Sequence, residues 1–498
     1  MTGQLGAAAT GIARRTAAGA IWAILAFGAA RFLSFATNLI LARLLAPADF
    51  GLVSFALIFI TAATLLQDLG MSSAIIYGGR DARTIAGTAL TINVVAAIGL
   101  FALIVLATPF LAGYQPDPAA ASVLVALAAG PIITAIGAVQ NALLMRDLDF
   151  RRKLVPDSVP YAVSGFVSIG LALAGFGVWS LVIGYLVKTS ASTVLLWLLG
   201  DVRPVPAFRW TVAVDLLSYG KHIAYHSIVG FMSSNLDYLV IGYLLGAHAL
   251  GLYTMAFMVA HLVPTFSQVA ISVLFPALTR LRDDRAALDS MFTDAHRILW
   301  ALTLPAAFLL FIGAPAFVHV VLGERWAESI LTLRILAPIA CLNAVVQVYG
   351  PASKAGGRPD LLWKFFLVRC IVSAPLLLLS ARFGIEGVAA CVSLIVLVAV
   401  PIAAIVFCRA IEYPARRLLG VAAPYLAGAA AMCALVVAAY VAPGWRAASE
   451  SLPGAILLGS AAVLLYAALV YRLDPTLPRL MLKPLGYWFQ KLPRDAVA

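Results

Sequence analysis

Long apolar stretches follow one another along almost the whole chain, separated by short polar connections. A helix needs about 20 apolar residues to cross a hydrocarbon core about 30 Å thick. Runs such as LFALIVLATPFL (100–111) do not alternate apolar and polar residues, as the strands of a membrane barrel would. The pattern therefore predicts an all-α integral membrane protein with about fourteen spanning helices, near 17–42, 50–68, 86–109, 119–144, 157–177, 178–200, 215–244, 250–276, 297–320, 329–351, 361–381, 385–408, 417–441 and 453–471.

Composition agrees with this pattern. Of the 498 residues, 63% are hydrophobic and only 11% are charged, whereas soluble proteins average about 45–50% and about 25%. The apolar run after Arg14 and Arg15 is too long for an export signal, so we interpret it as the first spanning helix. The five cysteines fall in or beside the predicted spans without C-x-x-C spacing, which indicates neither disulfides nor a zinc site.

The net charge of +12 indicates topology rather than nucleic-acid binding. With the N-terminus inside, 25 of the 34 lysines and arginines lie in connections on the inner side, and four lie in outer connections. Basic residues are enriched in cytoplasmic loops of membrane proteins. We therefore expect both termini in the cytoplasm and no nucleic-acid partner.

A short motif occurs twice in the chain, 200 residues apart. LARLLAPADFGL (41–52) resembles IGYLLGAHALGL (241–252), and both follow the first predicted helix of a group of six. An even number of spans brings both groups into the membrane from the same side, which indicates parallel repeats. The predicted domains are an N-terminal lobe (1–205, helices 1–6), a C-terminal lobe (206–412, helices 7–12) and a final helix pair with a cytoplasmic tail (413–498).

No motif indicates catalysis. There is no G-x-x-x-x-G-K-[ST] loop for a nucleotide, and the acidic residues lie almost entirely in loops or at helix ends. The outer loops are too short to hold a folded catalytic domain. His222 and His226 have the i, i+4 spacing of two metal ligands, but no third ligand is in view. We expect neither an enzyme, nor a cofactor, nor a metal.

Charged residues within the spans are the candidates for function, because charge at membrane depth is costly and usually faces a bundle interior. The cations are Arg31, Lys188, Lys221, Arg334 and Arg369, and the only acid at similar depth is Asp237. This imbalance predicts a cavity for an anionic cargo. Lys221, Arg334 and Arg369 are near enough to a boundary to reach headgroups instead. Asp237, His222 and His226 are candidates for ion coupling.

Other polar and aromatic residues have simpler interpretations. Gln140, Asn141, Asn343 and Gln347 favour hydrogen bonds between helices. Tyr161, Trp179, Trp326 and other aromatics lie near predicted boundaries, as in the interfacial belt of membrane proteins. Trp179 and Trp326 are also placed where an outer saccharide could stack on them.

Several longer motifs resemble one family. They are LARLLAPADFGLVSFALIFI with QDLGMSSAII (41–76), NALLMRDLDFRRK (141–153), GVWSLVIGYL (177–186), LVIGYLLGAHALGLYTMAF (239–257), VLFPALTRLRDD (273–284) and GERW (323–326). The chain resembles the Wzx-type polysaccharide and lipopolysaccharide flippases, the polysaccharide transport family of the multidrug/oligosaccharidyl-lipid/polysaccharide exporter superfamily. The resemblance covers essentially the whole chain.

This resemblance implies two pseudosymmetric lobes around a cation-lined cavity in a bacterial inner-membrane protein. The implied cargo is an oligosaccharide linked to undecaprenyl pyrophosphate, flipped by alternating access for exopolysaccharide, O-antigen or capsule synthesis. A polysaccharide polymerase and export machinery are the implied protein partners, beside membrane lipids. The alternatives are a multidrug cation exporter of the same superfamily, which would need carboxylates at depth, and a membrane-embedded glycosyltransferase or polymerase, which would need a sizeable outer loop.

Overall fold

The structure is a computed structural model, and it describes residues 28–68, 70–77, 82–112, 118–147, 149–265, 285–350, 353, 358, 360–441 and 452–482. Helices make up nearly all of these residues, and no strand occurs among them. Ten stretches in the described ranges are long and apolar enough to cross a membrane. The predicted all-α membrane architecture is therefore confirmed, whereas the total of about fourteen spans stays a prediction.

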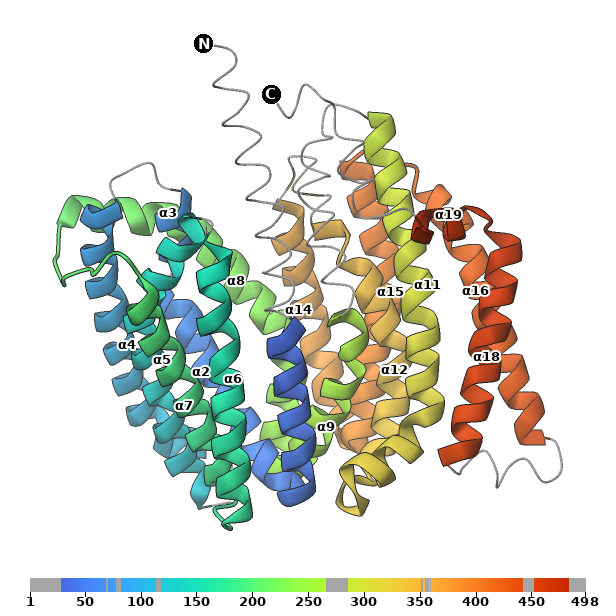
Figure 1. Cartoon of the computed structure of the whole chain (residues 1–498), viewed down its shortest axis with the longest axis horizontal. Helices are drawn as coiled ribbons and strands as arrows, with labels where there is room; N and C mark the ends of the chain where they lie inside the picture. The colour runs from blue at the N-terminus through green and yellow to red at the C-terminus, as the bar shows by residue number, and fades with distance from the viewer. Residues whose placement is uncertain are drawn as a thin grey trace. The chain divides into compact units, whose positions relative to one another are not determined.

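The chain divides into two compact units, with the boundary between Thr254 and Met255 (Figure 1). The first unit contains a helix at 28–44 and then α2 (Pro47–Asp68), α3 (Met71–Tyr77), α4 (Ala82–Ala112), α5 (Ala119–Arg146), α6 (Phe150–Leu173), α7 (Val178–Leu199), α8 (Trp210–Leu244) and the start of α9 (Gly246–Ala260). The second contains α11 (Arg285–Phe317), η1 (Val318–Leu322), η2 (Glu324–Trp326), α12 (Ser329–Val346), α14 (Asp360–Ser380), η3 (Ala381–Phe383), α15 (Gly384–Ala410), α16 (Ala415–Val441), α18 (Leu452–Leu473) and α19 (Thr476–Leu482). The lobe boundaries drawn from the sequence stay predictions.

Every apolar range read from the sequence coincides with helix where the structure describes it. The differences lie at helix ends. The short helices α3 and α19 were not expected, and α11 begins at Arg285 rather than near 297. The first turns of α11 carry polar residues such as Asp289 and Asp294. Hydropathy alone therefore reads them as loop, although they continue the same helix.

The core of the first unit brings α2, α4, α5 and α7 together. Ile60, Val123, Leu127 and Val182 are almost completely buried in one apolar cluster, which also includes Ala247 from the start of α9. Many of the other buried positions are alanines, and small residues let membrane helices approach closely. The helices that surround the first predicted cations are thus held by direct packing.

The two copies of the repeated motif contact each other at the first turns of α2 and α9. A Cβ atom on Gly51 would lie 2.6 Å from the carbonyl carbon of Ala247, and one on Gly251 would lie 2.6 Å from the carbonyl carbon of Pro47. The contact is reciprocal, since Pro47 and Gly51 correspond to Ala247 and Gly251 at the offset of 200. Such a reciprocal contact is what a pair of related helix hairpins produces at a two-fold axis.

The same hydrogen bond also closes the turn in each copy. The Leu45 amide donates to the Leu41 carbonyl at 2.8 Å, and the Leu245 amide donates to the Ile241 carbonyl at 2.8 Å. Gly246, which begins α9, has φ +84°, a conformation that favours glycine. The repeat therefore extends to this hydrogen bond, whereas the positive φ is specific to the second copy, because Ala46 does not have one.

The second unit has its own core, where the final helices pack on α11. Tyr349 and Phe407 stack at 5.8 Å between ring centroids, beside Phe292. At one end of this core, the buried Asp474 carboxylate lies 3.3 Å from the Arg297 Nε, and the Tyr425 hydroxyl donates to it at 2.9 Å. These contacts fasten the end of α18 to α11 and α16.

Asp474 remains ionised in this environment. Burial opposes its charge, but hydrogen bonds from Thr476 and Tyr425 and the Arg297 guanidinium outweigh that effect. The pKa of the Asp474 carboxyl is therefore lowered from its ordinary value.

Candidate functional site

The close approach of α6 and α7 positions the central candidate, Lys188. A Cβ atom on Gly184 would lie 3.2 Å from the Ser168 Cβ and closer still to its hydroxyl, so only glycine allows this spacing without a shift. Further along the same pair of helices, the Ser192 hydroxyl donates to the Pro156 carbonyl at 3.1 Å. Lys188 lies one turn after Gly184, between these two contacts. Its position relative to α6 is therefore fixed by the register of the helix pair.

Two tyrosine rings hold the Lys188 ammonium. Its Nζ lies 5.0 Å from the ring centroid of Tyr185, one turn earlier on α7, and 5.4 Å from that of Tyr161 on α6. An ammonium over an aromatic face is attracted by the ring quadrupole, more strongly where water is excluded. Among the residues that the structure describes, the contacts recorded for the Lys188 ammonium are with these two rings and not with a carboxylate. The ammonium is thus stabilised by neutral groups, which leaves its charge available to an anion.

The tyrosine rings have fixed places themselves. A Cβ atom on Gly130 of α5 would lie 2.5 Å from the Tyr185 ring and 2.9 Å from its hydroxyl, so this ring fills the space that the glycine leaves. Tyr161 lies one turn before Gly165, where the Thr37 hydroxyl of the 28–44 helix would be 2.6 Å from an added Cβ. This contact holds the first described helix against α6, and it brings Arg31 toward the site.

Arg31 is the second cation of this site. Its side chain is exposed on the 28–44 helix, and its positive charge acts electrostatically against that of Lys188, which burial already disfavours. Two adjacent cations raise the local positive potential, and a guanidinium binds phosphate oxygens in bidentate fashion. Of the five cations predicted from the sequence, Arg31 and Lys188 thus interact electrostatically. We call Arg31, Tyr161, Tyr185 and Lys188 the cationic site.

Arg334 and Arg369 lie in the second unit and also contact aromatic rings. The Arg334 guanidinium is 6.0 Å from the ring centroid of Phe311, and its buried Nε has no hydrogen-bond partner among the described residues. The Arg369 guanidinium is 5.7 Å from the ring of Phe366, one turn earlier on α14. Both are half-buried. Their part in a common site with Lys188 stays a prediction.

The candidates for ion coupling fall partly outside the described residues. The side chains of Lys221, His222 and His226, on α8, are among those that the structure does not describe, so their roles stay predictions. Asp237, on the same helix, is buried and accepts a hydrogen bond of 2.5 Å from the Tyr253 hydroxyl of α9. This bond ties α8 to α9 two residues beyond Gly251.

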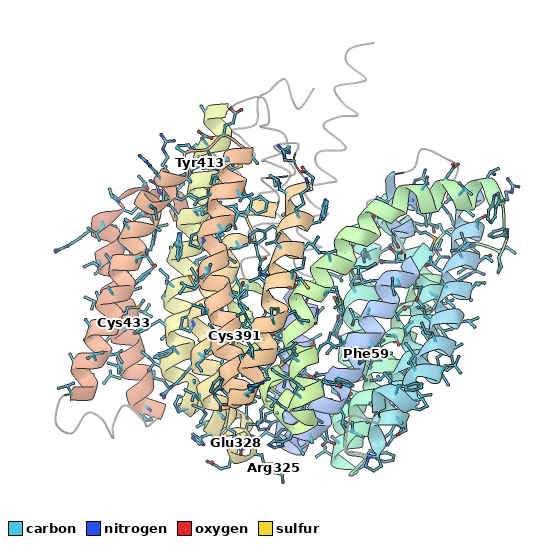
Figure 2. The ribbon with its side chains drawn as sticks, turned by 180° about the vertical axis from the view of Figure 1, so that it is seen from behind. Phe59, Arg325, Glu328, Cys391, Tyr413 and Cys433 are labelled. Carbon is cyan, nitrogen blue, oxygen red and sulfur yellow. The ribbon has the colours of Figure 1, made fainter. Side chains whose placement is uncertain are left out.

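The structure changes the interpretation of two aromatic residues. Trp326 is completely buried, so it is not available to stack on a saccharide, whereas Trp179 is 37% exposed. Figure 2 shows Arg325 and Glu328, which flank the buried tryptophan, at the edge of the second unit. Tyr161 lies in the middle of α6 rather than near a helix boundary, and it contacts Lys188.

Two neighbouring polar residues of α5 hydrogen-bond to other segments. The Gln140 amide donates to the Val202 carbonyl at 2.5 Å, and the Asn141 oxygen accepts from Lys153 at 2.8 Å. The predicted bond between helices is therefore confirmed for Asn141, which joins α5 to α6, whereas Gln140 bonds to the connection after α7 instead. The Gln347 side-chain oxygen has no hydrogen-bond partner among the described residues.

Sequence reasoning missed a buried histidine. His296 on α11 is 1% exposed, its Nδ1 lies 2.8 Å from the Phe292 carbonyl, and its Nε2 has no hydrogen-bond partner among the described residues. It precedes the range predicted as a span, so hydropathy placed it in a loop. No group of three potential metal ligands occurs in the described part of the chain.

These observations define a class: a multi-span helical membrane protein with cations held inside its helix packing. The family model described as "Polysaccharide biosynthesis protein" matches residues 40–331, which is more than half of the chain. The chain therefore belongs to this family of polysaccharide biosynthesis membrane proteins, and the family resemblance seen in the sequence is confirmed.

Individual relatives agree with the family. The chain is 25% identical to the lipopolysaccharide biosynthesis protein WzxC of Escherichia coli over 74% of this chain and 76% of WzxC. It is 26% identical to the succinoglycan biosynthesis transport protein ExoT of Rhizobium meliloti over 71% and 72% of the two chains.

Solved transporters share the fold. The lipid II flippase MurJ in an inward closed conformation superposes with a TM-score of 0.71 at 13% identity, over 91% of this chain and 99% of MurJ. An inward-facing multidrug transporter of the MATE family superposes with a TM-score of 0.63 at 16% identity, over 79% and 98%. At these identities the likeness establishes the fold, and the chemistry must be argued from this chain's own residues.

Proposed function

We propose that the protein flips lipid-linked oligosaccharides across the bacterial inner membrane for the synthesis of a surface polysaccharide. The carrier lipid we infer is undecaprenyl pyrophosphate. Family membership and the names of the relatives support this cargo class, since WzxC and ExoT are named for polysaccharide synthesis and MurJ as a flippase. The observation that carries the proposal is the cationic site, in which Lys188 lies over two tyrosine rings and Arg31 adds a second positive charge that acts on it electrostatically.

The physical problem of this reaction is the headgroup. A diphosphate cannot enter hydrocarbon without losing hydration, whereas the polyprenyl tail never needs to leave it. An ammonium and a guanidinium held at depth replace the lost water by charge-assisted hydrogen bonds to phosphate oxygens. Tyr161 and Tyr185 hold the ammonium without neutralising it, and their rings also suit contact with a sugar.

The repeated motif supports alternating access as the mechanism. We infer that the reciprocal contact of α2 and α9 at Gly51 and Gly251 closes one side of the pathway, and that opening this side separates the two first turns. Because the contact consists of backbone against backbone, it can separate without breaking an ion pair. The two related hairpins would then move as halves related by rotation about their shared axis.

Direction requires a gradient or removal of the product, because no nucleotide motif occurs in the sequence. Asp237 is the best candidate for coupling, since a buried carboxyl bonded to a phenol changes its contacts when it gains a proton. His222 and His226 are further candidates. We further propose cytoplasmic termini, on the basis of the 25 basic residues in inner connections. A polysaccharide polymerase and the export machinery are the protein partners we propose.

The charges also argue against the alternatives. A multidrug transporter shares this fold, but a cationic drug would be repelled where Arg31 and Lys188 lie together. A glycosyltransferase would need an outer domain, and the outer connections within the sequence are only a few residues long. Relatives and fold both indicate transport rather than catalysis.

A deletion strain tests the proposal. Lipid-linked repeat units should accumulate on the cytoplasmic leaflet, and surface polysaccharide should be lost. Lys188→Gln should reproduce this phenotype at normal protein abundance, whereas Lys188→Arg should restore part of the surface polymer. Normal polymer and no accumulation in the deletion strain would refute the function, and full activity of Lys188→Gln would refute the site alone.

A further inference from the structure

The connection between α7 and α8 is tied to neighbouring helices along its length. Residues 201–209 contain no helix. Four hydrogen bonds fasten them to α4 and α5: Gln140 to the Val202 carbonyl at 2.5 Å, Thr91 to the Ala207 carbonyl at 3.0 Å, the Arg209 amide to Thr88 at 3.3 Å and the Ala207 amide to the Gly87 carbonyl at 3.4 Å. This connection is therefore a fixed surface element rather than a loose linker.

The first turns of α8 continue this surface element. At 35 residues, α8 is far longer than the roughly 20 residues that a span requires. Figures 1 and 2 show its first turns lying across the ends of the upright helices of the first unit before the helix bends toward α2. Val212 and Leu216 are buried there against α3, α4 and α5. The opposite face of these turns is covered by no described residue of the chain.

Large apolar side chains gather on that uncovered face. Val205 is 75% exposed, Phe208 56%, Trp210 72% and Val214 46%. The Phe208 and Trp210 rings lie side by side, with centroids 6.2 Å apart. A contiguous apolar group of this kind is unfavourable in water and marks a surface with a partner.

The charges next to these side chains identify the partner. Arg203 and Arg209 are exposed beside the aromatic pair. The nearby Asp201 carboxylate is already bound by Arg152, at 2.6 Å. Asp215 is the other exposed acid on these first turns. Aromatic and aliphatic side chains combined with arginines are typical of segments that lie in the headgroup layer of a bilayer.

We propose that residues 203–214 form an interfacial anchor that binds anionic phospholipids. The anchor crosses the ends of α4 and α5, and the lipids belong to the leaflet on that side of the membrane. Phe208, Trp210 and Val214 enter the boundary between headgroups and acyl chains, while Arg203 and Arg209 contact lipid phosphates. A lipid surface fits better than a soluble protein, because the anchor lies at the ends of two apolar spans, Ile85–Phe110 and Ala119–Arg146. Its hydrogen bonds to α4 and α5 would transmit this binding to the first unit, whatever cargo the protein carries.

The experiment uses the full chain, with its five native cysteines replaced, in nanodiscs of phosphatidylcholine alone or of phosphatidylcholine with phosphatidylglycerol. An environment-sensitive fluorophore is attached to Phe208→Cys, and to Glu324→Cys as an aqueous reference, because the Glu324 side chain is 81% exposed. The label at 208 should be quenched by lipids carrying a doxyl group and protected from iodide. Phosphatidylglycerol should increase this protection.

Charge removal then tests the choice of lipid. Arg203→Gln with Arg209→Gln should weaken the preference for phosphatidylglycerol by about tenfold or more, since each basic residue near an anionic surface contributes severalfold. The matched control, Arg409→Gln with Arg416→Gln, removes two exposed arginines of the second unit and should leave the label at 208 unchanged. The proposal is overturned if iodide quenches the label at 208 as readily as the reference, or if the label is protected only in native membranes that contain other proteins.

Discussion

Replacing Gly51 with alanine tests the contact between the repeated motifs. The new Cβ would lie 2.6 Å from the Ala247 carbonyl carbon and 3.0 Å from its Cα, whereas carbon atoms normally stay about 3.5–4.0 Å apart. The Ala247 carbonyl oxygen would be closer still. No side chain can rotate to relieve a clash with backbone, so the first turns of α2 and α9 must separate by more than about 1 Å. Overpacking of this kind costs about 1–3 kcal/mol, which is about a 5- to 150-fold bias against the closed contact.

The same argument predicts that Gly51→Ala and Gly251→Ala are not additive. Both residues belong to one contact, so separating the helices for the first substitution leaves room for the second. Gly99→Ala is the matched control, because a Cβ there would meet no atom within 4 Å. It should be neutral or slightly stabilising, since alanine favours helix over glycine.

The assay measures the distance between spin labels at Ala48→Cys and His248→Cys, together with thermal unfolding of the purified protein. Gly51→Ala should lengthen the label distance or broaden its distribution, lower the unfolding temperature, and shift transport. Gly99→Ala should change none of these. An unaltered distance and an unaltered unfolding temperature in Gly51→Ala would show that the contact does not exist. A distance that stays constant throughout transport would refute the opening of this contact.

Three further predictions concern other parts of the chain. Gly184→Leu should push α6 away from α7, separate Lys188 from Tyr161 and reduce transport at least tenfold. Transport at the wild-type rate by a correctly folded Gly184→Leu protein would contradict this prediction. Asp237→Asn should abolish the dependence of transport on a proton gradient in proteoliposomes. Tyr253→Phe should retain this dependence and lose about 1–3 kcal/mol of stability. Gradient-driven transport in Asp237→Asn would exclude the Asp237 carboxyl as the coupling group. Asp474→Asn should destabilise the protein by about 1–2 kcal/mol at pH 7. Because the folded pKa of Asp474 is lowered, its stabilisation is fully present above its unfolded pKa of about 3.9 and is lost as the pH falls through the folded value. Unfolding of wild type and Asp474→Asn should therefore converge in acid, and a constant difference down to pH 2 would contradict the role of the charge.

Hydropathy predicted the helical architecture because lipid forces backbone groups into helices over lengths that depend on membrane thickness. Hydropathy did not predict the helical segments that lie outside the apolar spans, where the lipid no longer imposes a helix. The first turns of α11 and the short helices α3 and α19 are stabilised by packing against neighbours, and a window of mean hydropathy does not detect this. Likewise, the start of α8 at Trp210 lies before the predicted span near 215.

The candidate site was predictable in its cations but not in their surroundings. Arg31 and Lys188 are recognisable as charges inside apolar ranges. Tyr161 and Lys188 are joined only by the register of α6 against α7, which depends on the close contact at Gly184. The repeated motif revealed Gly51 and Gly251 as equivalent positions, but their mutual contact is tertiary and has no sequence signal.

Binding of the carrier lipid to Lys188 variants tests the central claim most directly. The purified protein in nanodiscs is titrated with undecaprenyl diphosphate and with undecaprenol, which has the same tail and no phosphate. The wild-type protein should prefer the diphosphate. Lys188→Gln should lose about tenfold or more of that preference, because the variant lacks a charge-assisted contact. Lys188→Arg should keep most of the preference. Equal binding of both lipids by wild type, or an unchanged preference in Lys188→Gln, would contradict the account.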